Sequence, residues 1–164
     1  KTENKVEKNE QIITEKEVYS SNILENVNYS TKDADQNEYL VTALKGEIDY
    51  INPNIIYLTN VKAEIKLNNS DNIVIVSDFG KYNSDNFDTI FSKNVLINYL
   101  DNKIAGEYLD FSIERNLMVI SKDIVYTNLD NILHADVLEM NIETRDTKIF
   151  MYEDEKKVNI KSKN

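Results

Sequence analysis

The sequence predicts an all-β protein, an antiparallel β-jelly roll or rolled sheet of stacked hairpins with open ends. Apolar, β-branched and aromatic residues gather in segments of about ten residues, with polar clusters between them every 10–15 residues or so. The chain contains only three Gly and one Pro, so the segments are almost free of residues that interrupt a sheet. Downstream of residue 18, no segment shows the apolar spacing of an amphipathic helix.

Clusters of Asn, Asp and Ser delimit the expected strands. KDADQ (residues 32–36), NNSDN (68–72) and NLDN (128–131) are examples of these turn signals. The short connections favour antiparallel neighbours, because a parallel pair needs a long crossover. The expected strands cover residues 19–29, 37–50, 55–67, 73–83, 88–100, 104–114, 117–127, 132–143, 147–152 and 158–160.

The chain divides into a short leader and one domain. Residues 1–18 carry mixed charges and few large apolar side chains, so we expect a solvated leader or linker. Residues 19–164 are numerous enough to bury the core of a single β-jelly roll.

Composition excludes several classes of function. The net charge of −10 argues against a nucleic-acid partner, which would require a basic face. The chain has no Cys and one His, His134, so we expect no disulfide, no metal site and no cofactor. No apolar run approaches the roughly 20 residues of a membrane-spanning helix.

One unit repeats along the chain, and it is clearest in DFGKYNSDNFDTIFSKNVLIN (residues 78–98). At a common offset, residues 43–46 align with 77–80 and the Asn-Val pair 60–61 aligns with 94–95. At a second offset, IFSKNV aligns with VISKDI (residues 119–124). These matches preserve the alternation of positions along the strands, so we interpret them as four degenerate copies of one hairpin unit.

The repeat also predicts which side chains face inward, because aligned strand positions share a face. Aligned positions are apolar or aromatic, whereas alternate positions such as Lys62, Lys66 and Glu143 are polar. The apolar interior is either an open groove or a closed core. The candidate lining residues are Tyr57, Val61, Ile65, Phe91, Val95, Ile97, Tyr99, Leu109, Phe111, Ile113, Ile120, Ile124, Tyr126, Leu138, Met140 and Ile142.

From about residue 19 to residue 160, the chain resembles the LptC family of lipopolysaccharide export proteins and the wider OstA-like group that includes LptA. The resemblance rests on NEYLVTALKGEIDY (37–50), on the small-x-x-Gly steps at 43–46 and 77–80, and on strands such as IIYLTNVKAEI (55–65). The third unit departs from this pattern because Gly106 follows Ala105 directly, and the fourth unit has no Gly.

The resemblance implies a periplasmic, non-enzymatic relay whose interior receives the acyl chains of lipopolysaccharide. The implied partners are the membrane subunits of an inner-membrane ABC transporter and an LptA-like bridge protein, joined through edge strands. It also implies an N-terminal helix, absent from this sequence, that anchors the protein to the inner membrane. An open sheet edge recruits other strands, so edge-to-edge self-association is a further expectation.

Two alternatives remain open at this point. The first is a soluble LptA-like bridge protein with the same fold, although the charged leader fits LptC better. The second is a carbohydrate-active β-solenoid enzyme, which would need paired carboxylates at a fixed separation. Its candidate acids are Asp78, Asp101, Asp110 and Glu114.

Overall fold

The computed structural model describes residues 22–68, 70–153 and 156–163, and the predicted leader lies outside these residues. The described part consists of strands and turns, so the all-β prediction is confirmed. The strands are β1 (Ile23–Lys32), β2 (Glu38–Ile48), β3 (Ile55–Lys66), β4 (Ile73–Asn83), β5 (Thr89–Tyr99), β6 (Asn102–Ser112), β7 (Leu117–Thr127), β8 (Asn131–Asn141), β9 (Thr147–Phe150) and β10 (Asn159–Ser162).

Short polar side chains form the turns between the strands. Between β1 and β2, Asp33 Oδ1 accepts hydrogen bonds from the backbone N–H groups of Asp35 and Asn37, each at 2.9 Å. Between β7 and β8, Asn128 Oδ1 accepts from the backbone N–H of Asn131 at 2.7 Å. Such side chains replace a backbone acceptor in a tight turn, which explains why the turn clusters located the strand ends well.

All ten strands belong to one antiparallel sheet. Strands β1 to β8 pair in sequence order, and β9 and β10 both pair with the outer edge of β8. The sheet does not close, because β1 pairs only with β2 among the described residues. The predicted rolled sheet with open ends is therefore confirmed.

The odd-numbered long strands bend near their middle, at residues that align in the sequence repeat. Asn26, Asn60, Asn94 and Asp123 have φ angles of 52°, 53°, 51° and 53°. Asn and Asp enter this left-handed region more readily than other non-glycine residues. Register shifts at the same level mark β-bulges in the ladders from β4 to β8, and bulges bend a strand.

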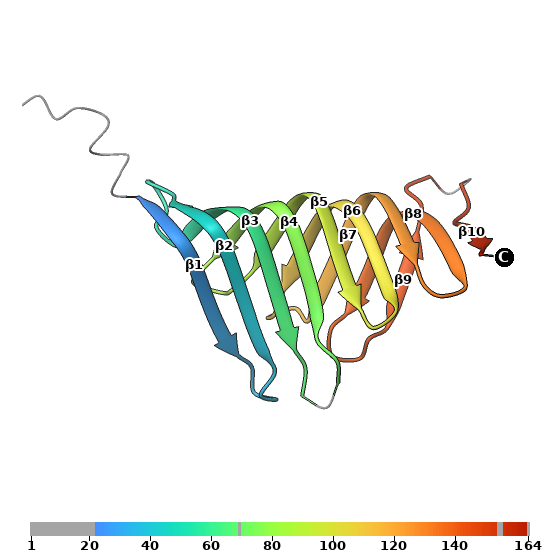
Figure 1. Ribbon diagram of the computed structural model, residues 1–164, viewed down its shortest axis with the longest axis horizontal. Helices are drawn as coiled ribbons and strands as arrows, with labels where there is room; N and C mark the ends of the chain where they lie inside the picture. Colours follow the sequence, from blue (N-terminus) through green and yellow to red (C-terminus); the bar gives the residue numbers. More distant parts are fainter. Residues whose placement is uncertain (1–21, 69, 154–155, 164) are drawn as a thin grey trace, which may run out of the picture.

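The bends fold the sheet into two facing layers, which Figure 1 shows as strands that arch over and return behind. Ring contacts between strands that are not neighbours in the sheet cross from one layer to the other. Tyr29 of β1 stacks on Tyr82 of β4 with ring centroids 4.7 Å apart. Tyr39 of β2 lies 5.9 Å from Phe111 of β6. We call the layer that holds Tyr29 the first layer, and the layer that holds Tyr82 the second layer.

Each long strand thus contributes one half to each layer. The first layer comprises residues 27–32, 38–43, 61–66, 73–77, 95–99, 102–106, 124–127 and 131–135. The second layer comprises residues 23–25, 46–48, 55–59, 79–83, 89–92, 108–112, 117–121 and 137–141, followed by β9. The apolar core lies between them.

The bends bring side chains of one strand close to the backbone of another, which explains the repeated glycines. A Cβ atom on Gly46 would lie 2.9 Å from Cγ2 of Val27, and one on Gly106 would lie 2.9 Å from Cγ1 of Ile120. These distances are shorter than real Cβ contacts, so the absence of a side chain at Gly46 and Gly106 allows close packing.

The inward placement of Tyr57 was wrong. Tyr57 is 46% exposed on the outer face, whereas its neighbours Ile56 and Leu58 are buried in the core. The cause is the left-handed Asn60, which shifts the alternation by one position, so that Leu58 and Val61 face inward three residues apart.

Strand β5 keeps the predicted alternation of inward and outward side chains, because its bend is different. Two consecutive residues, Lys93 and Asn94, are left-handed there, and Phe91 and Val95 face inward four residues apart. The repeat therefore aligned Tyr57, which faces outward, with Phe91, which faces inward.

Candidate lipid-binding pocket

Half of the predicted lining residues lie in a closed core rather than along an open groove. Phe91 and Leu109 are 0% exposed and Ile120 is 1% exposed, so these side chains are packed on all sides. The predicted residues in this closed core are Val61, Ile65, Phe91, Val95, Leu109, Phe111, Ile120 and Ile124.

An apolar pocket opens between the layers on the C-terminal side of the sheet. Its volume is about 370 Å³, and it lies between the first-layer halves of β4–β7 and the second-layer half of β8 with β9. Six predicted residues line it, namely Ile97, Tyr99, Tyr126, Leu138, Met140 and Ile142. The other six lining residues were not predicted from the sequence, and they are Ile73, Asn102, Ile104, Arg145, Thr147 and Ile149.

Polar side chains stand among the apolar side chains that line the pocket. The hydroxyl groups of Tyr99 and Ser70 are hydrogen-bonded at 2.9 Å, and Arg145 Nη1 donates to Tyr99 Oη at 3.2 Å. The Tyr126 hydroxyl donates to Asn102 Oδ1. Tyr99 and Tyr126 thus combine an apolar ring in the pocket with a satisfied hydroxyl group, as amphipathic aromatic residues do at the boundary with water.

On the N-terminal side, an aromatic cluster fills the same space. We define the aromatic cluster as Tyr29, Tyr39, Tyr82 and Phe111; with Ile113 and neighbouring side chains it leaves a cavity of only about 10 Å³. Burial, and the nearby Tyr29, raise the pKa of Tyr82 to about 12. Burial and a hydrogen bond to Asp33 also raise the pKa of Tyr39. The predicted residue Ile113 belongs to this closed side.

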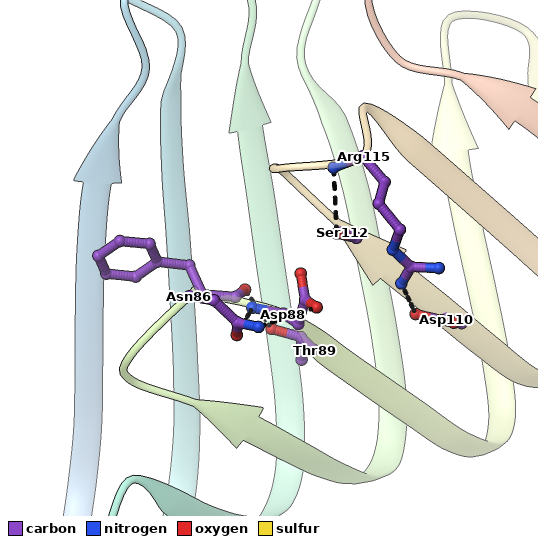
Figure 2. A network of polar contacts seen from close by, with 7 residues as sticks. Asn86, Asp88, Thr89, Asp110, Ser112 and Arg115 are labelled. Atoms are coloured by element: carbon purple, nitrogen blue, oxygen red, sulfur yellow. Dashed lines mark hydrogen bonds and ion pairs between the residues drawn. The ribbon is translucent and has the colours of Figure 1, made fainter.

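The acids considered as paired carboxylates do not converge. Asp110 accepts a hydrogen bond from Arg115 Nη2 at 2.9 Å, in a network with Ser112 (Figure 2). Asp78 Oδ2 accepts from Asn94 at 2.7 Å on the outer face near the bend. Figure 2 also shows Asn86 and Asp88 bonded to each other in the β4–β5 turn. These contacts organise turns and strand surfaces.

No metal-binding arrangement is found among the residues that the structure describes. Within these ranges, no three or more His, Cys, Asp or Glu side chains are grouped so that they could hold an ion. His134 is exposed on β8, opposite Val125 of β7 and Asn159 of β10.

A larger hollow of about 490 Å³ lies on the outer face of the second layer. Charged and exposed residues line it, including Lys45, Glu47, Tyr57, Phe79 and Lys81. Its greater volume does not make it the better shelter for a hydrocarbon chain, because transfer from water favours an apolar surrounding. The pocket between the layers is therefore the stronger candidate for a lipid.

None of the described residues forms a helix that could cross a lipid bilayer. A scan against protein-family models finds no match for this chain, and a search of the curated proteins finds none either.

Proposed function

We propose that the protein carries lipopolysaccharide without catalysis, as a periplasmic relay of the LptC kind. In this proposal, it shields the acyl chains in an apolar interior and passes the lipid from an inner-membrane ABC transporter to a periplasmic bridge. The observation that carries the proposal is the apolar pocket between the two layers, with Ile97, Leu138 and Met140 among its walls.

The energetics of hydrocarbon transfer support such a shelter. Exposing an acyl chain of about a dozen CH₂ groups to water costs on the order of 10 kcal/mol. If a methylene group takes about the 30 Å³ of a water molecule, the pocket holds on the order of a dozen of them. The pocket thus matches one acyl chain in volume, and further chains would require the layers to separate.

The sheet edges support docking to partners. Among the described residues, the ten-residue strand β1 has a neighbour on one side only. The outer edge of β8 is covered by β9 and β10, which are four residues each. We propose that the transporter subunits, the bridge protein and other copies of this chain dock by strand addition at these edges.

Proline in β9 tests the docking part of this proposal. The substitution Lys148→Pro should abolish binding of a bridge protein while leaving most of the fold intact, because proline removes a backbone donor from an edge strand. Pull-down of the partner and circular dichroism are the two readouts. Retained docking with an intact fold would exclude strand addition at β9.

Photo-crosslinking in cells tests the lipid path. A photoreactive residue at Ile97 or Met140 should capture lipopolysaccharide, because both side chains line the pocket. The matched control is Lys62, which points outward from β3. Capture at Lys62 with none at Ile97 or Met140 would exclude the pocket as the lipid site.

The soluble LptA-like bridge remains the alternative with the same fold. The start of the complete gene separates the two, because an uncleaved helix indicates an LptC-like protein and a cleaved signal peptide indicates an LptA-like one. A carbohydrate-active enzyme has less support, since Asp78 and Asp110 are engaged on separate parts of the surface.

A further inference from the structure

Among the described residues that line the pocket between the layers, Arg145 has the one cationic side chain. Arg145 lies in the turn between β8 and β9, is exposed, and has a φ angle of 65°. Its guanidinium carbon lies 5.9 Å from the ring centre of Tyr99, and its Nη1 donates to the Tyr99 hydroxyl. The turn therefore holds a positive charge at the boundary between water and an apolar pocket.

This charge has no carboxylate partner among the described residues. The adjacent Asp146 accepts a hydrogen bond from Thr144 Oγ1 at 2.9 Å rather than from Arg145. The chain has one other arginine, Arg115, and its guanidinium is paired with Asp110 at 2.9 Å. Arg145 thus contacts an aromatic ring and forms no ion pair among the described residues, so its charge is available for an anion from outside.

We propose that Arg145 binds the anionic headgroup of an amphiphile whose hydrocarbon chain occupies the pocket, so that the pocket selects anionic over neutral amphiphiles. This inference rests on the proposed lipid-carrier function and adds a specificity-determining residue to it. The planar guanidinium matches phosphate and carboxylate groups through two parallel N–H donors. The hydroxyl groups of Tyr99 and Ser70 lie beside it and are hydrogen-bonded to each other, so one O–H of this pair remains to donate to the same group.

The experiment compares two probes that share a chain and differ in charge. Isothermal titration of the full chain with dodecyl phosphate and with dodecyl maltoside, each below its critical micelle concentration, measures the two affinities. Arg145→Gln should weaken dodecyl phosphate binding by about tenfold or more, the usual effect of losing a charge-assisted hydrogen bond. It should leave dodecyl maltoside binding unchanged, and Arg145→Lys should recover part of the loss because it restores the charge.

Two matched variants separate this inference from the function on which it rests. Arg115→Gln removes the other arginine, which does not line the pocket, and should change neither affinity. Met140→Asp puts a charge in the pocket wall and should weaken both probes. If neither probe binds the wild-type chain, or if Met140→Asp has no effect, the lipid-carrier function itself fails.

Different results would contradict the proposed selectivity for anionic over neutral amphiphiles. It fails if both probes bind in the pocket but Arg145→Gln weakens both equally or neither. It also fails if inorganic phosphate binds as tightly as dodecyl phosphate with the same dependence on Arg145, since the site would then recognise an anion without a chain.

Discussion

The two sides of the interior differ although the same repeat builds both. On the N-terminal side, Tyr29 and Tyr39 of the first layer meet Tyr82 and Phe111 of the second, and the space between the layers is filled. On the C-terminal side, aliphatic side chains such as Ile97 and Leu138 surround a cavity of about 370 Å³. Aromatic rings from both layers close the N-terminal side, whereas the second-layer and β9 residues that line the pocket are not aromatic.

The offset between the layers adds a second cause. Strand β1 meets β4 across the interior and β2 meets β6, so the second layer is displaced along the sheet relative to the first. Twist and tilt of the strands produce such offsets. The second layer ends at the four-residue strand β9, and the residues on that side of the pocket belong to β8, β9 and the turn between them. The pocket therefore lies at the end of the second layer.

The largest expected effect separates the closed core from the pocket wall. Phe91→Ala should lower the free energy of unfolding by about 3–5 kcal/mol, because Phe91 is fully buried and the cavity cannot collapse. Met140→Ala should cost less, about 1–2 kcal/mol, because Met140 already borders empty space. Urea denaturation of both variants measures the difference. Equal losses would mean that the pocket wall is packed as tightly as the core.

A second prediction concerns the bends on the two sides. Asn60→Val and Asn94→Val should each lower the free energy of unfolding by about 1–2 kcal/mol, because a β-branched residue is strained at a φ near 50°. Of these two variants, only Asn94→Val should also weaken dodecyl phosphate binding. The reason is that Ile97 and Tyr99, which line the pocket, follow Asn94 in the same strand.

The control for the bends is Asn28→Val on the exposed face of β1, where the left-handed conformation is absent. This substitution should leave stability nearly unchanged, as measured by the same denaturation. Equal losses for all three variants would show that valine, rather than the backbone bend, causes the effect.

The smallest effect concerns pH and the aromatic cluster. Burial raises the pKa of Tyr82 to about 12 in the folded chain, above its value of about 10 in the unfolded chain. The stabilisation is therefore complete below pH 10 and is lost as pH rises through 12. At about pH 11 the expected loss is about 1 kcal/mol.

Urea denaturation between pH 8 and pH 11 measures this loss, and Tyr82→Phe serves as the comparison. The variant has no ionisable group at this position, so its stability should decline less over the same range. An identical decline in both proteins would assign the effect to other groups.

The order of the strands could be predicted from the sequence because the turn signals are local. Asp33 and Asn128 accept backbone hydrogen bonds within their own turns, and those contacts depend on no distant residue. The repeat then placed Phe91 and Val95 on the inner face correctly. Tyr57 was placed wrongly because the alternation slips at Asn60, and the residue type alone does not state its φ angle.

The split between closed core and pocket could not be predicted from the sequence. Inward-facing apolar positions of the same repeat line both the closed core and the pocket. Which of these regions is open depends on the offset between the layers and on where β9 ends. Arg145 gave no pattern signal either, because it lies in a turn and reaches Tyr99 from 46 residues away in sequence. Long-range geometry decides both features.

The most direct test of the proposed lipid site uses two of the three methionines of the chain. Met140 lines the pocket, whereas Met118 is 2% exposed in the closed core. Nuclear magnetic resonance of the labelled methionine methyl groups, during titration with dodecyl phosphate, reports on both positions at once. We expect the Met140 resonance to shift with ligand concentration while that of Met118 stays in place. A shift at Met118 without one at Met140 would contradict the proposal that the pocket receives the chain.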